Sequence, residues 1–383
     1  MQIHTASPLP TYSFRDLLYP KKFTLVLHIS NKFLMRERRH QQVLRLTLPP
    51  PGLSLNPSPL SSASRSTSPG ISELKKLSVL GRGSGGTVYK VSHKQTGAIY
   101  ALKVVRGDQD DDDDLEAGAR EAEILRRVDS SEHVVRYVGV FNGGLKEVEG
   151  GVGGGGGLCL VMEYMDAGSL HDILRRKKRL PEHIISGVVK SVLKGLQYLH
   201  GLGIVHGDVK PSNLLVNTRG QVKLADFGAA AAVRDGAKPR TRPDDRLEVH
   251  GRACRGTCPY MSPERMDPEM WDGERCDGYA GDVWSLGVVA MECYVGRFPL
   301  VGPGQKLDWV TLMCAVCFGD DVERMVKMGS PEFESFCRRC LERHWRRRGT
   351  ADELLLHPFL DKSQTIGIDH QDIISYINLS EID

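Results

Sequence analysis

The sequence predicts an α+β fold of two lobes, in which a small strand-rich lobe precedes a larger helical one. From residue 72 onward, short strand-like runs alternate with turn residues. After Asp166 the apolar residues recur three or four positions apart, as they do along amphipathic helices. The preceding stretch 49–70 is so rich in Pro and Ser that it cannot bury enough apolar surface to order itself.

These changes in composition predict the domain organisation. We expect a disordered arm at 1–71, a folded domain at 72–360 with lobes at 72–165 and 166–360, and a tail at 361–383. Five runs carry the strand signal of the first lobe: LKKLSVLG, TVYKVSHK, IYALKVVR, VVRYVGVF and LCLVMEYM.

An acidic run, Asp108–Asp114, separates the third of these strands from the helical pattern LEAGAREAEILRRV. Acidic residues stabilise the first turn of a helix through its dipole. Runs of like charge are more often solvated, however, so we expect a loop here.

Composition narrows the class of protein. Charged residues make up 26% and hydrophobic residues 40% of the chain, as in ordinary soluble globular proteins. No apolar run approaches the roughly 20 residues that a membrane helix needs, and Phe23–Ser30 is too short and lacks a following cleavage site. We expect no membrane partner and a cytoplasmic location, with the nucleus as an additional one. An organelle transit peptide stays open, because Asp16 is the only acidic residue in 1–34.

The nine cysteines are an odd number spread along the chain, which suits a reducing compartment. Cys314 and Cys317, followed by Cys337 and Cys340, have the spacing of a structural zinc site. Both pairs lie in amphipathic helical patterns, and cysteine is among the most often buried residues. We therefore interpret the four as core side chains, with zinc as the alternative.

A glycine-rich turn lies between the first two predicted strands. It reads Gly81-x-Gly83-x-x-Gly86-x-Val88, and glycines allow the backbone to approach phosphate oxygens without a side-chain clash. Dinucleotide-binding domains use a similar pattern but open a helix directly after it. Here TVYKV alternates like a strand, which favours a loop over the phosphates of a nucleoside triphosphate.

Lys103 follows on the next strand, seventeen residues after Gly86. A lysine at this place can pair with the α- and β-phosphates. The predicted helix beyond it offers Glu121 as an ion-pair partner, and Glu123 as the competing choice. The Arg-Glu dipeptide favours Glu121.

Two further motifs complete the pattern. The run IVHGDVKPSNLL, written H-x-D-x-K-P-x-N, resembles the catalytic loop of eukaryotic protein kinases, and ADFG follows it. Asp208 would receive the proton of the acceptor hydroxyl, and Lys210 would offset charge on the transferred phosphoryl group. Asn213 and Asp226 would ligate Mg²⁺.

The order of these motifs and several longer phrases resemble the mitogen-activated protein kinase kinases, within their plant branch. The phrases are GRGSGGTVYKV, VHGDVKPSNLL, GTCPYMSPER, DGYAGDVWSLGVVAMECYVGRFPL and TADELLLHPF. The resemblance implies a bilobal kinase fold, ATP and Mg²⁺ as cofactors, and phosphorylation of Thr and Tyr in the activation loop of a downstream MAP kinase. It also implies an upstream kinase as a partner.

The resemblance extends to single residues. Met162 falls at the gatekeeper position, Glu163 and Met165 at the adenine hinge, and Glu264 would pair with Arg348. The nucleotide-binding residues that it implies are Leu80, Gly81, Arg82, Gly83, Gly86, Val88, Ala101, Lys103, Met162, Glu163, Met165 and Leu215.

The N-terminal arm is basic. Residues 1–70 hold nine Lys and Arg against two acidic residues, a net charge of +7. Nucleic-acid binding is one interpretation, but the segment 35–48, MRERRHQQVLRLTL, looks like the docking peptide with which such kinases hold MAP kinases. Arg38 and Arg39 would meet an acidic patch, while Leu44 and Leu46 would enter an apolar groove. We therefore expect no nucleic-acid partner.

The sequence departs from the family in two connected places. Gly207 replaces the arginine that usually precedes the catalytic aspartate and holds the phosphorylated activation loop. The two usual phosphosites fall near Leu247 and at Ala253, so that Thr241 is the only hydroxyl side chain between Gly228 and Gly256.

The residues assigned to chemistry are all present, so we predict an active kinase whose switch is not phosphorylation at the usual sites. A scaffold that binds nucleotide and docks MAP kinases is the alternative, followed by a Ser/Thr kinase acting elsewhere in the cascade.

Overall fold

The computed structural model describes residues 70–83, 85–106, 112–142, 157–233, 258–271, 273, 276, 278–302, 304–305, 307–319, 322, 327, 329–365, 373 and 375–376. All of them belong to the unit Ser64–Asp383, the second of two into which the chain divides. The predicted docking peptide at 35–48 lies outside the described residues, and so do Thr241, Leu247 and Ala253.

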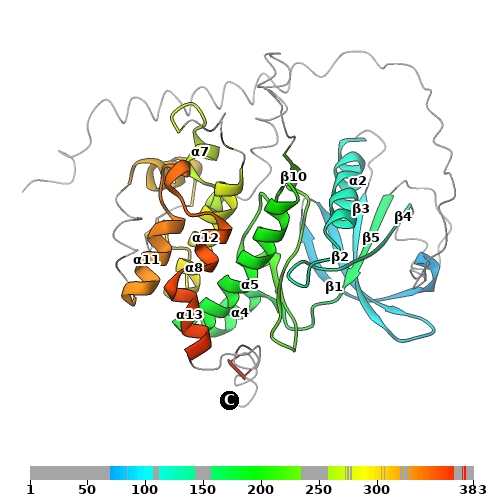
Figure 1. Cartoon of the computed structure of the whole chain (residues 1–383). Helices are drawn as coiled ribbons and strands as arrows, with labels where there is room; N and C mark the ends of the chain where they lie inside the picture. The colour runs from blue at the N-terminus through cyan, green and yellow to red at the C-terminus, as the bar shows by residue number, and fades with distance from the viewer. Residues whose placement is uncertain are drawn as a thin grey trace, which may run out of the picture. The chain divides into compact units, whose positions relative to one another are not determined.

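The first lobe is built on a five-stranded antiparallel sheet in the order β1-β2-β3-β5-β4 (Figure 1). The five predicted runs supply its strands, which are β1 (Leu74–Gly83), β2 (Gly86–His93), β3 (Ile99–Arg106), β4 (Tyr137–Asn142) and β5 (Gly157–Glu163). A short 3-10 helix, η1 (Ile71–Glu73), precedes the sheet.

Strand register separates the two faces of the sheet. Tyr89 lies opposite Leu102, and both are buried in the core cluster of this lobe. Val88 lies opposite Lys103, and Ala101 lies opposite Met162. Since side chains alternate along a strand, these four residues share the other face. The alternation therefore gives one face to the core and the other to the candidate site.

Helix α2 (Asp112–Arg127) packs against β3 and β5 on that second face, where Gly118 approaches Val105 and Leu158 (Figure 1). Its start corrects the prediction of a loop over the whole acidic run, because Asp112–Asp114 form its first turn. Carboxylates favour the positive end of the helix dipole, which is the alternative that the sequence had offered.

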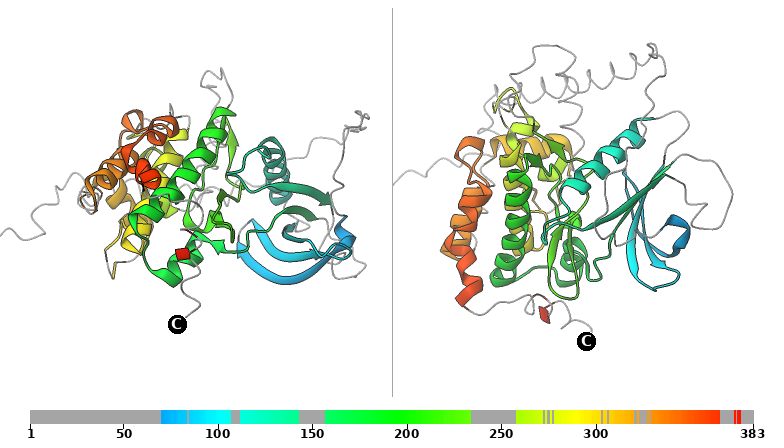
Figure 2. Two further views of the ribbon diagram at one scale, coloured as in Figure 1. Left: turned by 60° about the horizontal axis from the view of Figure 1, so that its bottom comes forward. Right: turned by 45° about the vertical axis from the view of Figure 1, so that its right-hand side comes forward.

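The second lobe is mainly helical (Figure 2). Its helices are α4 (Leu170–Lys177), α5 (Glu182–Gly201), α7 (Pro263–Met266), α8 (Tyr279–Val295), α9 (Trp309–Met313), α11 (Pro331–Cys340), α12 (Ala351–Leu355) and α13 (Pro358–Thr365). Helix α5 packs against α8, α12 and α13. Twelve of the seventeen residues of α8 are buried, so α8 forms the centre of this lobe. The prediction of an α+β fold with two lobes is confirmed.

Very short strands place the loops between the lobes. A three-stranded sheet joins β6 (Gly168–Ser169), β8 (Leu214–Val216) and β9 (Val222–Leu224). A second pair joins β7 (Ile204–Val205) to β10 (Ala231–Ala232). The segment 206–213 runs from β7 to β8 and contains the 3-10 helix η2 (Pro211–Asn213), while 225–230 runs from β9 to β10. The two motif loops are thus held at both ends.

The four cysteines with zinc-like spacing are free thiols. Cys314 and Cys317 lie in the π-helix η5 (Cys314–Phe318), which follows α9, and Cys337 and Cys340 lie in α11. Cys317, Cys337 and Cys340 are buried, as predicted for core side chains, but Cys314 is exposed, so the prediction was wrong there. Among the described residues no cluster of His, Cys, Asp and Glu suits a metal ion by itself.

The same part of the chain contains no helix that is both long and apolar enough to cross a membrane. The 3-10 helix η6 (Trp345–Arg347) precedes α12, and α13 continues past the predicted domain end at residue 360.

Candidate active site

The centre of the site is a buried ion pair between the lysine of β3 and a glutamate of α2. Lys103 Nζ lies 2.8 Å and 2.7 Å from the two carboxylate oxygens of Glu121, and both side chains are almost fully buried. Glu123 instead lies on the surface and pairs with Arg126 one turn later. Glu121 is therefore the partner of Lys103, as the dipeptide suggested.

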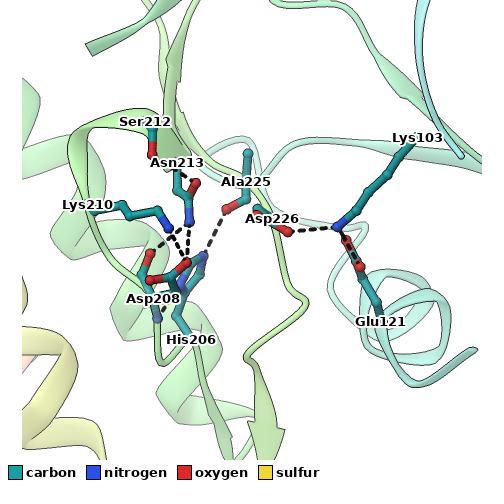
Figure 3. Close-up of polar contacts among 9 residues, drawn as sticks. All are labelled: Lys103, Glu121, His206, Asp208, Lys210, Ser212, Asn213, Ala225 and Asp226. Atoms are coloured by element: carbon teal, nitrogen blue, oxygen red, sulfur yellow. Dashed lines mark hydrogen bonds and ion pairs between the residues drawn. The ribbon is translucent and has the colours of Figure 1, made fainter. Parts of the chain in front are cut away.

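Lys103 also reaches the second lobe, because its Nζ lies 2.8 Å from Asp226 Oδ1 (Figure 3). Asp226 is 46% exposed at its side chain, so this carboxylate opens towards solvent. It has a φ of +62°, a left-handed conformation that Asp tolerates better than most residues.

Two carboxylates share one ammonium at this point. Burial lowers the pKa of Lys103, but the charges of Glu121 and Asp226 raise it by more than burial lowers it, so the net shift is upward. Burial raises the pKa of Glu121, which the lysine offsets only in part. Partial burial also raises the pKa of Asp226, yet Lys103 outweighs this and the net shift is downward. These shifts favour a charged Lys103 and a charged Asp226. When Glu121 is charged as well, the three groups together carry a net charge of −1.

The catalytic-loop residues form a second group beside Asp226 (Figure 3). Lys210 Nζ lies 2.7 Å from Asp208 Oδ2. Asn213 Nδ2 donates to the Asp208 carbonyl at 2.9 Å and to its Oδ2 at 3.0 Å. These bonds fix the Asp208 carboxylate, and they turn the amide oxygen of Asn213, which the Ser212 hydroxyl contacts at 3.3 Å, to the other side.

His206 links the two motif loops. The Asp208 N–H donates to His206 Nδ1 at 3.3 Å, and Nε2 lies 3.1 Å from the Ala225 carbonyl. Because Nδ1 accepts, Nε2 carries the proton and donates to that carbonyl. The fully buried imidazole also packs against the Phe227 ring, with centroids 5.0 Å apart. This side chain therefore holds the Asp208 loop against the Asp226 loop.

Asp282 of α8 supports the same loop from below. Its buried carboxylate accepts from the backbone N–H of His206 at 2.9 Å and of Gly207 at 2.8 Å, and it lies 3.0 Å from His200 Nε2. Burial raises the pKa of Asp282, but the His200 hydrogen bond and charge and the Gly207 N–H outweigh it, so the pKa is lowered. A charged carboxylate is thus available to hold two successive backbone amides.

Gly207 has a left-handed backbone, with a φ of +77°. A Cβ at this residue would lie 2.9 Å from the Ala229 carbonyl oxygen. Its own carbonyl accepts a hydrogen bond from Arg265 Nη1 at 2.7 Å. The departure from the family pattern therefore falls on a strained position that glycine occupies without cost.

Arg265 belongs to α7, which is fixed to the second lobe by its neighbour. Glu264 accepts from Arg348 Nη1 at 2.7 Å and from Nη2 at 3.0 Å, and both side chains are buried. The guanidinium also donates to the Ala280 carbonyl at 2.6 Å. The predicted pairing of Glu264 with Arg348 is confirmed.

The glycine-rich turn lies over Lys103. A Cβ at Gly85 would meet Lys103 Nζ at 3.2 Å, whereas at Gly81 and Gly83 nothing lies within 4 Å of that position. Gly86 has a φ of +117°, and a Cβ there would come within 2.2 Å of the Val104 carbonyl oxygen. Only glycine fits this last position.

The residues predicted to bind the adenine base lie around the hinge that connects the two lobes. Val88, Ala101 and Met162 lie on the site face of the sheet, and Met162 and Met165 are buried. Leu80 and Arg82 are exposed on β1, and Leu215 is half-buried on β8.

The side chain of Glu163 is turned away from that space. It accepts from Lys223 Nζ at 2.6 Å and from the Arg136 N–H at 2.7 Å. Any contact of Glu163 with a bound base would therefore come from its backbone.

The chemistry of these side chains fits ATP and Mg²⁺. A carboxylate and an amide oxygen, from Asp226 and Asn213, are ligands that Mg²⁺ prefers, and this ion usually takes its remaining ligands from phosphates and water. The Asp226 carboxylate beside Lys103 supplies negative charge for a cation.

Sequence reasoning assigned no role to four residues that the structure places around the site, which are His206, Lys223, Arg265 and Asp282. Their contacts join segments far apart in the chain, 58 positions in the case of Arg265 and Gly207. Local pattern gives no signal for such pairs. The charged Asp282 within the apolar run GDVWSLGVVAM was the one visible hint, because a buried charge needs partners.

Comparison with known proteins agrees with this geometry. Residues 74–360 match the protein kinase domain, so the fold is that of a protein kinase. The chain is 46% identical over 332 residues to Mitogen-activated protein kinase kinase 10 of Arabidopsis thaliana, with 85% of this chain and 98% of that protein covered.

Two further relatives from the same plant are equally similar. Mitogen-activated protein kinase kinase 7 is 46% identical over 336 residues, with 86% of this chain and 99% of that protein covered. Mitogen-activated protein kinase kinase 9 is 46% identical over 332 residues, with coverages of 85% and 98%. The chain therefore belongs to the mitogen-activated protein kinase kinases and is a protein kinase of a MAP kinase cascade. Membership in the family implies ATP with Mg²⁺.

Proposed function

We propose that this protein phosphorylates both Thr and Tyr in the activation loop of a MAP kinase, and that its activity does not depend on phosphates at the usual loop positions. One observation carries the proposal. Lys103 is bonded at the same time to Glu121 of the first lobe and to Asp226 of the second. Phosphoryl transfer by a kinase requires the ion pair of this lysine and glutamate, with the aspartate close by to hold Mg²⁺. Here the three groups lie together with glycine at position 207.

The proposed roles follow from the positions of the side chains. Lys103, held by Glu121, binds the α- and β-phosphates, while Asp226 and Asn213 hold Mg²⁺. When bound, Mg²⁺ and ATP supply the γ-phosphoryl group that is transferred. Asp208, fixed by Lys210 and Asn213, accepts the proton of the substrate hydroxyl.

Lys210 has a second proposed role, because its ammonium offsets charge on the group in transit. The adenine base lies between Val88, Ala101 and Met162 of the first-lobe sheet and Leu215 of β8. It also lies against the backbone from Glu163 to Met165. Leu80 and Arg82 lie at the edge of this space, next to Gly81, Gly83 and Gly86.

The N-terminal arm supplies the proposed grip on the substrate. Arg38 and Arg39 attract an acidic patch of the MAP kinase, and Leu44 and Leu46 enter an apolar groove beside it. An upstream kinase of the cascade remains a proposed partner by a route other than the usual loop sites.

The proposal is tested by a kinase assay against a panel of catalytically dead MAP kinases, with the phosphosites mapped by mass spectrometry. We expect phosphate on both Thr and Tyr of one activation loop, without prior treatment by an upstream kinase. The variants Lys103→Met and Asp226→Asn serve as inactive references, since both remove groups that face nucleotide or metal. Tight binding to a MAP kinase with no transferred phosphate would instead establish a scaffold.

A further inference from the structure

The peptide group between Gly207 and Asp208 leads directly into the catalytic aspartate. Its carbonyl, that of Gly207, accepts from Arg265 Nη1 at 2.7 Å, and its N–H, that of Asp208, donates to His206 Nδ1 at 3.3 Å. The preceding peptide is held separately, because the N–H of Gly207 donates to Asp282 Oδ1 at 2.8 Å. The bond from Arg265 reaches the Gly207–Asp208 peptide from α7, outside the catalytic loop.

Glycine at position 207 makes this peptide depend more strongly on the bond from Arg265. With no Cβ, glycine moves between positive and negative φ at little cost. A residue with a side chain, once placed at +77°, would be confined by its contact with Ala229. At Gly207 the backbone itself offers little resistance to rotation, so the orientation of the following peptide depends on its hydrogen-bond partners, Arg265 at 2.7 Å and His206 at 3.3 Å.

The helix that carries Arg265 is anchored. Arg265 follows Glu264 in α7, and Glu264 is gripped by two nitrogens of Arg348 in a fully buried pair. Helix α7 closes the activation segment, which we define as residues 226–266. The bond from Arg265 to Gly207 therefore connects the end of this segment directly to the catalytic loop.

We infer that Arg265 is a positioning residue, whose guanidinium holds the Gly207–Asp208 peptide in the orientation that aims Asp208 at the substrate hydroxyl. In a kinase with arginine before the catalytic aspartate, a loop phosphate can order this region through new charge-assisted bonds. Here the bond from Arg265, which we call the tether, holds the Gly207–Asp208 peptide without a phosphate. The inference rests on the proposed function, because only an active kinase has an Asp208 to aim.

The test compares Arg265→Ala and Arg265→Lys with the full-length protein, using a dead MAP kinase as substrate. For Arg265→Ala we expect kcat to fall at least about tenfold, because small displacements of a catalytic group are costly. The KM for ATP should stay within about twofold, since Lys103, Glu121 and Asp226 are untouched. Arg265→Lys, which keeps a charged donor, should retain more activity than Arg265→Ala.

Chemical rescue separates positioning from general stability. Ethylguanidinium in solution should raise kcat of Arg265→Ala and leave the unmodified protein unaffected. Arg338→Ala is the matched control, because Arg338 is 61% exposed at its side chain and pairs on the surface of α11 with Glu334. This variant should match the unmodified protein throughout.

The other outcomes separate failure of the proposed function from failure of the tether. If the unmodified protein transfers no phosphate, both the proposed function and the tether fail. If it is active and Arg265→Ala has the same kcat, only the tether fails. The tether is also overturned if Arg265→Ala and Arg265→Lys lose thermal stability and all kinetic parameters together, without rescue. Should Arg265→Ala not fold, a loss of kcat at unchanged KM in Arg265→Lys supports the inference.

Discussion

Glu121 and Glu123 lie two positions apart on one helix and differ completely in environment. Glu121 is buried against Lys103, whereas Glu123 is 60% exposed at its side chain. Glu121→Gln removes the charge that orients Lys103, so we expect kcat/KM to fall at least about tenfold. Glu123→Gln is the control and should leave kcat/KM unchanged. Equal effects of the two substitutions, in a steady-state assay at varied ATP, would show that the pair does not orient the lysine.

Restoring arginine at Gly207 tests this departure from the family, and the backbone at this position makes the substitution costly. A side chain at a φ of +77° and 2.9 Å from the Ala229 carbonyl costs about 1–3 kcal/mol of strain. Gly207→Arg alone should therefore lower the melting temperature and the activity. With hydroxyl residues also introduced at Leu247 and Ala253, treatment by an upstream kinase should restore activity.

Gly207→Ala in the same background is the matched control, because it carries the strain without the charge. It should gain nothing from the upstream kinase. Strong activation of the unmodified protein through a phosphate at Thr241 would contradict the account of regulation without loop phosphates.

The short helix α7 owes its position to one buried ion pair at its second residue. Truncating Arg348 leaves Glu264 charged and buried without its guanidinium partner, which typically costs 3–5 kcal/mol. Arg348→Ala should lose stability of about that size in urea unfolding, with activity lost alongside. Arg347→Ala is the adjacent control, because Arg347 is exposed. Similar midpoints for the two variants would mean that the pair does not fix α7.

Elements with a strong local pattern were predictable, and those made by distant pairing were not. The five strands of the first sheet alternate or run apolar between turn residues, so the sequence locates them. Strands β7 and β10 contain two residues each and exist because Ala231 and Ala232 pair with Val205 and Ile204. No window of sequence announces such a pair.

The acidic run shows a closer decision between two local effects. Charge repulsion favours a loop, and the helix dipole favours a first helical turn. Residues Asp112–Asp114 are helical, so the second effect prevails there. Cys314 illustrates a similar limit, because an amphipathic pattern does not say on which side of its stripe a borderline residue lies. The site residues were predictable as motifs, but the contacts of Arg265, Lys223 and Asp282 depend on packing between elements.

At the scale of the whole chain, the basic arm and the folded domain are expected to act together on one substrate. Reversing Arg38 and Arg39 to Glu should weaken MAP kinase binding roughly tenfold at low salt, through slower association, and the difference should shrink as salt rises. Reversing Lys21 and Lys22 to Glu makes the same change of charge outside the docking peptide and serves as the control. Binding measured by surface plasmon resonance decides between them. Equal losses would indicate general attraction by the arm.

The bond between Lys103 and Asp226 joins residues 123 positions apart, and the pair of Glu264 and Arg348 closes a loop of 84. Proteins are made from the N-terminus at a finite rate, and large ones fold in stages. A ribosome that has released the strand-rich lobe has exposed a lysine and its glutamate, but no Asp208, no Asp226 and no Arg348. The complete set of these contacts can form only after translation has passed residue 348, so the order of synthesis sets the earliest moment at which the whole site exists.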